Sequence, residues 1–506
     1  MHVAQTIVRH VNENFEFSSN QTGSAEWRIT DIKSDVSKLI RLGALLHDIG
    51  HLPFGHTLED ELHHLRSHDG AERLLLIGNE KYPHYYLDKS IGSFREPADG
   101  WSLRELVNVL YHEIVASLQI TLEPFDVLCA IICKPPKNEG RAKDKWEKDS
   151  QELERKLDLQ VCRDVVGNTI CADFLDYLFR DWYHLGKPLY EDKRLYQYME
   201  ARTKTGSDKR TISRFVINVG QADRIRHDAL TNILELLENR YKLAETVLFH
   251  RTKLALTALL DRCLLEIRDL YKAIGFSNDV FLDTAERHFL TGSDDELASI
   301  LRQLASGGDG EVREKLQARI QASRAALAET IKPKNKGGQA TDLLTSDRDT
   351  PSTAAKTDVE IKIREISTLI DRLRDREIYT LAYKVKISDF TGPHTPDNAR
   401  LNRLIELYRD PENRRRYLLG MEARCNLPTG SLVFYCPPNA SMNAKIAKVN
   451  LLIDGDVTPF DAYDREGQDS SLTRGALWAQ IRRFLRALER SSLRREVHLG
   501  LANRGR

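Results

Sequence analysis

Residues 34–57 place four ionisable side chains at the end of an apolar helical pattern. Hydrophobic residues recur there at helical spacing, and His47, Asp48, His51 and His56 follow. A buried histidine costs free energy unless a hydrogen bond or a metal ion satisfies it. Consecutive residues at a helix end point about 100° apart, so His47 and Asp48 reach one ion only if other helices bring further ligands. The stretch therefore predicts a helical assembly around a polar site.

Histidine is concentrated in this part of the chain. Six of the 16 histidines fall within 22 residues, at positions 47, 51, 56, 63, 64 and 68. A single histidine on an apolar face is usually a core residue bonded to a carbonyl group. The adjacent His47–Asp48 pair instead favours a metal site, because imidazole and carboxylate together bind divalent and transition metals well.

The remaining patterns are mostly helical and predict a mainly α fold. Apolar residues recur at helical spacing in the segments 2–15, 34–48, 102–118, 161–185 and 228–271. Residues 210–219 alternate as a strand does, and strands are also expected in "GSLVFYCPP" and "IAKVNLLID". The expected architecture is a helical core with a small α+β C-terminal lobe, which ends in a helix over residues 470–491.

Four consecutive ranges are expected along the chain. Residues 332–358 are polar and rich in Gly, Pro, Ser and Thr, a composition that buries no core and predicts a flexible linker. The full division is 1–275 for the core, 276–331 for a helical extension, 332–358 for the linker and 359–506 for the C-terminal lobe.

Composition limits the classes of partner. The chain is 41% hydrophobic and 30% charged with zero net charge, so no global field attracts nucleic acid or an anionic membrane. No apolar run is long enough to span a bilayer, and the N-terminus lacks a secretory pattern. The seven cysteines have no paired spacing, which indicates buried thiols, including Cys129 and Cys133, and a cytoplasmic location.

A second polar cluster lies in "ADFLDYLFRD" (172–181). Asp173, Tyr177 and Asp181 stand at i, i+4 and i+8 on one helical face. A core stripe is expected beside them, formed by Phe174, Leu175 and Leu178. Taken alone, the pattern also fits a helix with an outward polar face.

Together these segments resemble a known family. "HDIGHLPFGH" (47–56), "SHDGAERLL" (67–75) and "ADFLDYLFRD" look like the deoxynucleoside triphosphate triphosphohydrolases of the HD-domain superfamily. That group includes bacterial dGTP triphosphohydrolases and the mammalian enzyme with a sterile-alpha-motif domain. "ENRYKLAETVLFHRTKLA" (238–255) extends the likeness, which covers residues 1–275 well and is thinner beyond 360.

The resemblance implies roles for the clustered residues. His47, Asp48 and Asp173 would be metal ligands. His56 would protonate the leaving 5′-oxygen, and His51 and His68 would line the phosphates. The substrate-binding positions would be Tyr177 and Asp181 at the deoxyribose, Arg240 at the phosphates and His250 in the pocket.

The implied reaction is metal-dependent hydrolysis of deoxynucleoside triphosphates to deoxynucleoside and triphosphate. Its cofactor would be a divalent or transition metal ion, namely Mn, Mg, Fe or Zn. The expected partners are the deoxynucleotide, a nucleotide effector and further copies of the chain in a homo-oligomer, with no membrane. Another HD-superfamily nucleotidase or phosphodiesterase, or a catalytically impaired nucleotide-binding protein, remains the alternative.

Two positions depart from the family pattern. Lys or Arg usually follows the distal aspartate, and here Phe174 stands there. The family's opening motif reads approximately His-Ser-Leu-x-Val. Aligning its valine with Val3 puts the first ligand histidine before Met1, so we expect this sequence to lack that ligand. His2, displaced by about 4.5 Å of helix rise, and the more distant His10 are poor substitutes.

Overall fold

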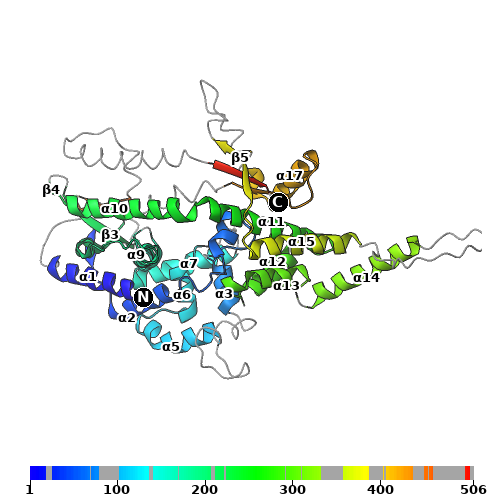
Figure 1. The fold of residues 1–506 in the computed structure, drawn as a ribbon. Coiled ribbons are helices and arrows are strands. Elements are labelled where there is room, and N and C mark those ends of the chain that lie inside the picture. Colours follow the sequence, from blue (N-terminus) through cyan, green and yellow to red (C-terminus); the bar gives the residue numbers. More distant parts are fainter. Residues whose placement is uncertain are drawn as a thin grey trace, which may run out of the picture. The chain divides into compact units, whose positions relative to one another are not determined.

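A computed structural model of the chain shows two compact units built from interleaved segments (Figure 1). The first unit comprises Met1–His51, Arg66–His250 and Pro438–Arg495, and the second comprises Leu52–Leu65, Arg251–Pro437 and Glu496–Arg506. The structure describes residues 1–18, 26–68, 70–78, 102–135, 141–168, 170–206, 211–221, 224–290, 292–308, 310–331, 357–386, 403, 406–436, 449–453, 455–459 and 496–501.

Helices form most of the first unit. They are α1 (His2–Ser18), α2 (Ser34–Leu46), α3 (Ala71–Gly78), α5 (Leu103–Ser117), α6 (Pro124–Ile132), α7 (Arg141–Leu157), α8 (Leu159–Gly167), α9 (Ala172–His184) and α10 (His227–Leu243), with the short turns η2 (Lys193–Tyr198) and η3 (Ala244–Leu248). Apolar faces at helical spacing pack into one core, as α1 shows with Ala4, Ile7, Val8 and Val11.

A sheet lies beside these helices. Its strands are β1 (Arg28–Thr30), β2 (Met199–Thr205), β3 (Thr211–Gln221), β4 (Arg224–Ile225), β7 (Asn450–Ile453) and β8 (Asp456–Pro459), in the order β1-β2-β3-β7-β8 with β4 on β3. All pairs are antiparallel except β3 with β7. Strands from the C-terminal part of the chain therefore complete a sheet of the first unit.

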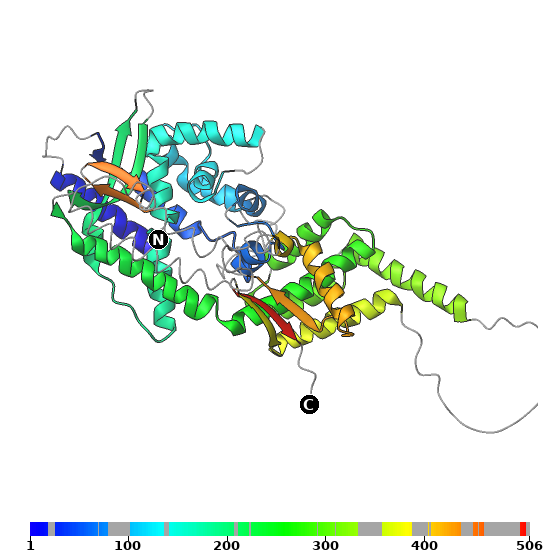
Figure 2. The same cartoon turned by 90° about the horizontal axis from the view of Figure 1, so that it is seen from above.

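The second unit is built on the long helix α11 (Arg251–Ala273). Its other elements are η1 (Thr57–Glu61), α12 (Asn278–Leu290), η4 (Asp294–Glu296), α13 (Leu297–Ala305), α14 (Glu311–Ile331), α15 (Asp358–Arg374), β5 (Thr380–Lys386), α17 (Pro411–Arg424), β6 (Leu432–Tyr435) and β9 (Glu496–Leu501). In the view of Figure 2, β5, β9 and β6 form a small antiparallel sheet.

The expectation of a mainly α fold is confirmed. The interleaved units group the chain differently from the four consecutive ranges expected from the sequence, which stay a prediction. The expected linker at 332–358 lies outside the described residues, apart from Thr357 and Asp358 at the start of α15. The expected helix at 470–491 also lies outside them. Cys129 and Cys133 are buried free thiols, as predicted.

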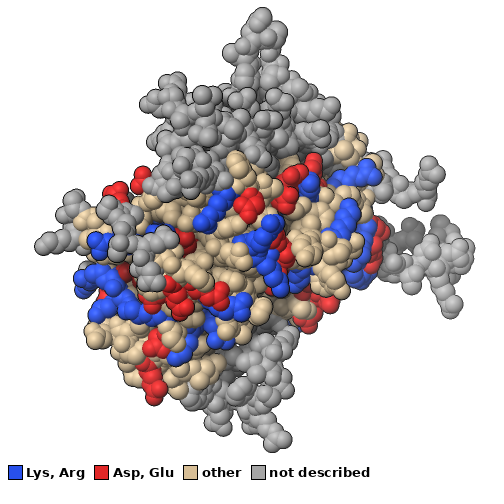
Figure 3. Space-filling view, turned by 90° about the vertical axis from the view of Figure 1, so that its left-hand side faces the viewer, with Lys and Arg blue, Asp and Glu red and all other residues tan. Residues whose placement is uncertain are grey.

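Charges of both signs are present on one face of the molecule. Lys and Arg are interspersed with Asp and Glu on the face drawn in Figure 3, in keeping with the zero net charge. Among the described residues, no helix is long and apolar enough to cross a membrane.

A buried polar network holds the segment Leu52–Leu65 in the second unit. His64 Nε2 lies 2.7 Å from Asp261 Oδ1, and Arg414 donates to the same carboxylate at 2.7 and 3.1 Å. Arg414 also donates to Leu62 O at 2.8 Å. The three side chains of His64, Asp261 and Arg414 are at most 1% exposed. Burial alone raises the pKa of Asp261, but Arg414 and His64 outweigh it and the pKa is lowered.

Candidate metal centre

The end of α2 carries the first two candidate ligands. Val36, Leu39 and Ile40 bury one face of α2 in the core. The helix ends at Leu46, and His47 and Asp48 follow in a turn. The core packing of α2 therefore fixes where these two side chains leave the backbone.

Helix α9 brings the third candidate ligand to the same place. Its core face of Phe174, Leu175, Leu178 and Trp182 is buried, which confirms the predicted stripe. Asp173, in the first turn of α9, then faces His47, with Asp173 Oδ1 3.2 Å from His47 Nε2.

The carboxylate of Asp48 completes the cluster. Its Oδ2 lies 3.3 Å from His47 Nε2, and one ligand atom each from His47, Asp48 and Asp173 lies within 4.8 Å of the others. Two atoms that each bind an ion at about 2.1 Å lie roughly 3.0–3.4 Å apart at ordinary coordination angles. The separations from His47 Nε2 match that spacing.

The surroundings of His47 leave its Nε2 available to a proton or a metal ion. Its Nδ1 lies 3.2 Å from Ala44 O, and a neutral ring that donates there presents a lone pair at Nε2. That Nε2 is buried, makes no hydrogen bond and faces two carboxylate oxygens. A lone pair facing two anionic oxygens is stable only with a proton or a metal ion between them. The residues present therefore fit a metal.

The pKa of His47 follows from the same geometry. Burial on its own lowers this pKa, because it disfavours the imidazolium form. Asp173 and Asp48 raise the pKa by more, so it lies above the ordinary value of 6.5. The site thus attracts positive charge at His47.

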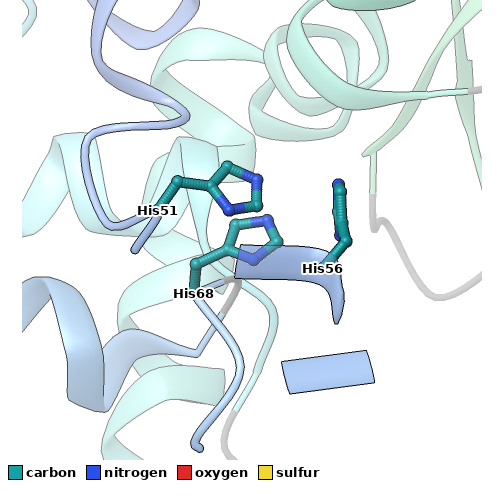
Figure 4. Close-up of side chains that lie close together, drawn as sticks. All are labelled: His51, His56 and His68. Carbon is teal, nitrogen blue, oxygen red and sulfur yellow. The ribbon is translucent and has the colours of Figure 1, made fainter. Parts of the chain in front are cut away.

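His51 and His68 lie together in the first unit. Their rings stack with centroids 3.5 Å apart and planes inclined by 28° (Figure 4). His51 Nε2 is 3.6 Å from Asp48 Oδ1, which links the pair to the cluster. Arg73 was not predicted as a site residue from the sequence. It is 1% exposed and donates hydrogen bonds to Gly50 O at 3.3 Å and to Arg66 O at 2.5 Å. Arg73 therefore ties together the two loops that carry these histidines.

The predicted substrate residues lie farther along α9 and on α10. Tyr177 contacts the Phe174 ring edge-to-face at 5.7 Å, and Arg240 lies over the same ring at 5.4 Å. Burial raises the pKa of Tyr177 to about 12, so the phenol is neutral at physiological pH. Burial also raises the pKa of Asp181. Phe174 thus acts as a packing surface between Tyr177 and Arg240.

Among known proteins, a family matches the segment that carries His47 and Asp48. Residues 4–99 match the HD domain family. That region includes His47, Asp48, His51, His56 and His68, whereas Asp173 lies beyond it. A phosphohydrolase from Bacteroides thetaiotaomicron VPI-5482 matches with 14% identity and a TM-score of 0.41, over 99% of this chain and 86% of that one. No curated protein matches.

His56, which lies in the matched region, folds with the second unit. Its Nδ1 lies 2.9 Å from Asp60 Oδ2, one helical turn along the chain, and its side chain is 64% exposed. An imidazole whose Nδ1 donates to a carboxylate is oriented as a general acid or base requires. Asp60 was also not predicted as a site residue from the sequence.

The other candidates are placed elsewhere. His250 is exposed and immediately precedes α11. His2 is exposed at the start of α1, and His10 contacts Glu13 at 2.9 Å and stacks on Tyr196. The ligand group that contains His47 includes neither His2 nor His10.

Proposed function

We propose that this chain is a metal-dependent phosphohydrolase that cleaves deoxynucleoside triphosphates to deoxynucleoside and triphosphate. The observation that carries the proposal is the convergence of Asp48 and Asp173 on the buried Nε2 of His47, at 3.3 and 3.2 Å. This trio would hold one divalent metal ion. When bound, such an ion lowers the pKa of water to about 7 and stabilises charge on a phosphate.

The remaining chemistry falls to side chains of the HD domain. Water attacks the α-phosphorus and the bond from that phosphorus to the 5′-oxygen breaks. By the family resemblance, His56 would donate a proton to the departing 5′-oxygen, and Asp60, 2.9 Å from its Nδ1, would hold the imidazole. His51 and His68 would orient the phosphates by hydrogen bonds.

The choice of a deoxynucleotide rests on the residues that follow Asp173. The neutral ring of Tyr177 would form a wall at C2′, and Asp181 would accept a hydrogen bond from the 3′-hydroxyl. Arg240, whose guanidinium lies over Phe174, would contact the triphosphate.

A direct assay tests the function. The chain is incubated with each dNTP, each NTP, dGMP and cyclic GMP in Mn²⁺ or Mg²⁺, and the products are separated by ion-exchange chromatography. We expect deoxynucleoside and triphosphate in equal amounts, with no diphosphate or monophosphate intermediate. Cleavage of the monophosphate or the cyclic nucleotide alone would assign another HD phosphohydrolase activity. A protein with stoichiometric metal and no product would be a binding protein.

Replacing His56 should separate catalysis from metal binding. In His56→Ala we expect kcat to fall about 10²–10⁴-fold, the usual worth of general acid assistance, with the metal retained. The matched control is His63→Asn in the same segment. His63 has a φ of 55°, a conformation that asparagine adopts readily, so the control should leave the rate unchanged. Loss of metal from His56→Ala would show that His56 is a ligand.

Replacing Tyr177 should weaken discrimination between sugars. A steric wall rejects an added hydroxyl by about 10²-fold, and in Tyr177→Ala we expect the kcat/KM ratio of dNTP to NTP to approach one. Tyr177→Phe keeps the ring and should keep the ratio. Equal use of both sugars by the unmodified chain would contradict the role of Tyr177.

A further inference from the structure

The second unit contains a cavity that the proposed reaction does not use. It measures about 330 Å³ and lies among the C-terminal half of α11 and the N-terminal ends of α12 and α17, all in the second unit. Small-molecule sites begin at roughly this size. None of the candidate metal ligands lines it.

Positive charge dominates the lining of this cavity. Its charged residues are Arg268, Lys272, Arg415, Arg416, Asp269 and Glu412. Lys272 pairs with Glu412 at 3.0 Å, and Arg415 pairs with Asp269 at 3.0 Å. These pairs use both carboxylates of the lining, so its net charge comes from the other two arginines.

Arg268 and Arg416 are the cations in excess. Among the described residues, neither makes an ion pair. Arg268 Nη1 is buried with no hydrogen-bond partner, and the guanidinium lies 5.7 Å from the centroid of the Phe281 ring. Nη1 has no accessible surface, so only the rest of the guanidinium can face a ligand in the cavity.

Two helix N-termini border this cavity, and residues of the chain itself cap both. At the start of the 13-residue helix α12, Val280 N–H donates to Ser277 Oγ at 3.5 Å. At the start of the 14-residue helix α17, Glu412 N–H donates to Asp410 Oδ1 at 2.9 Å, and Pro411 has no N–H. The attraction for an anion therefore comes from the two arginines.

We propose that this cavity binds a multiply charged phosphate anion, either free oligophosphate or the phosphate end of a nucleotide. Arg268 and Arg416 would donate charge-assisted hydrogen bonds to its oxygens. The inference is independent of the proposed reaction, because every residue that carries it belongs to the second unit.

Binding measured without metal tests the site. The full chain in EDTA is titrated calorimetrically with tripolyphosphate, ATP, adenosine and sulfate, so that the metal-dependent centre contributes little. We expect tripolyphosphate and ATP to bind and adenosine and sulfate not to bind. Tighter binding of ATP than of tripolyphosphate would identify a nucleotide as the source of the phosphate, and the reverse order would identify free oligophosphate.

Variants locate the binding. Arg268→Gln should weaken tripolyphosphate binding about 10-fold or more, and Arg416→Glu, on an exposed side chain whose exchange leaves the fold intact, should abolish it. Arg319→Gln changes an exposed arginine of α14 outside the cavity and should leave the affinity unchanged. Equal affinity in all four proteins, or binding of sulfate alone, would overturn the proposal. Neither outcome bears on the proposed hydrolysis, because none of the residues assigned to that reaction lines this cavity.

Discussion

Asp48→Ala should abolish both metal binding and hydrolysis. The variant removes one of the two carboxylates that face His47 Nε2, and with it half of the formal negative charge that would hold the ion. The Asp48 side chain is 55% exposed, so the fold should survive its loss. Metal content by mass spectrometry and triphosphate release are the two measurements.

A matched pair on α9 sharpens this test. Asp173→Asn changes the carboxylate that faces His47, whereas Asp176→Asn changes an exposed carboxylate of the same helix that pairs with Arg180 at 2.9 Å. We expect Asp173→Asn to behave as Asp48→Ala does, and Asp176→Asn to keep full metal content and rate. Stoichiometric metal and full activity in Asp48→Ala would remove the His47–Asp48 pair from the mechanism.

Local sequence patterns predicted the parts of this site that lie on single helices. The stripe of Phe174, Leu175 and Leu178 follows from helical periodicity, and it places Asp173 at the edge of the core. The apolar helix expected over residues 34–48 ends earlier, at Leu46, and His47 and Asp48 lie in the turn that follows it. That α9 would meet the end of α2 was expected only from the resemblance, because periodicity carries no information on which helices pack together.

Long-range contacts explain what the sequence did not show. The parallel pairing of Ile217 with Leu451 joins residues more than 200 positions apart, and no local pattern encodes such a pair. Similarly, His64 is one of six histidines between positions 47 and 68, and no local pattern distinguishes it from the others. Its partners Asp261 and Arg414 lie on α11 and α17, so its structural role emerges only in the folded chain.

Asp261→Asn should destabilise the second unit by about 3–5 kcal/mol, because it leaves the buried guanidinium of Arg414 without its counter-charge. All five tryptophans lie outside residues 251–437, so hydrogen exchange of α11 peptides is the suitable measurement. The control Asp371→Asn removes an exposed partner of Arg302 and should cost no more than about 1 kcal/mol. Equal protection of α11 in the two variants would show that the network adds nothing to stability.

The pH dependence of α11 exchange offers a second measure of the same network. Burial lowers the pKa of His64 from 6.5 to about 4, since the imidazolium would be desolvated and would lie near Arg414. The unfolded chain binds this proton near pH 6.5 and the folded chain only near pH 4, so stability falls as the pH falls between these values. The loss should reach on the order of 3 kcal/mol. His64→Asn removes the group that titrates, and its α11 exchange should depend less on pH across this interval than that of the unmodified chain. Identical pH profiles in the two proteins would mean that His64 is not buried in its neutral form.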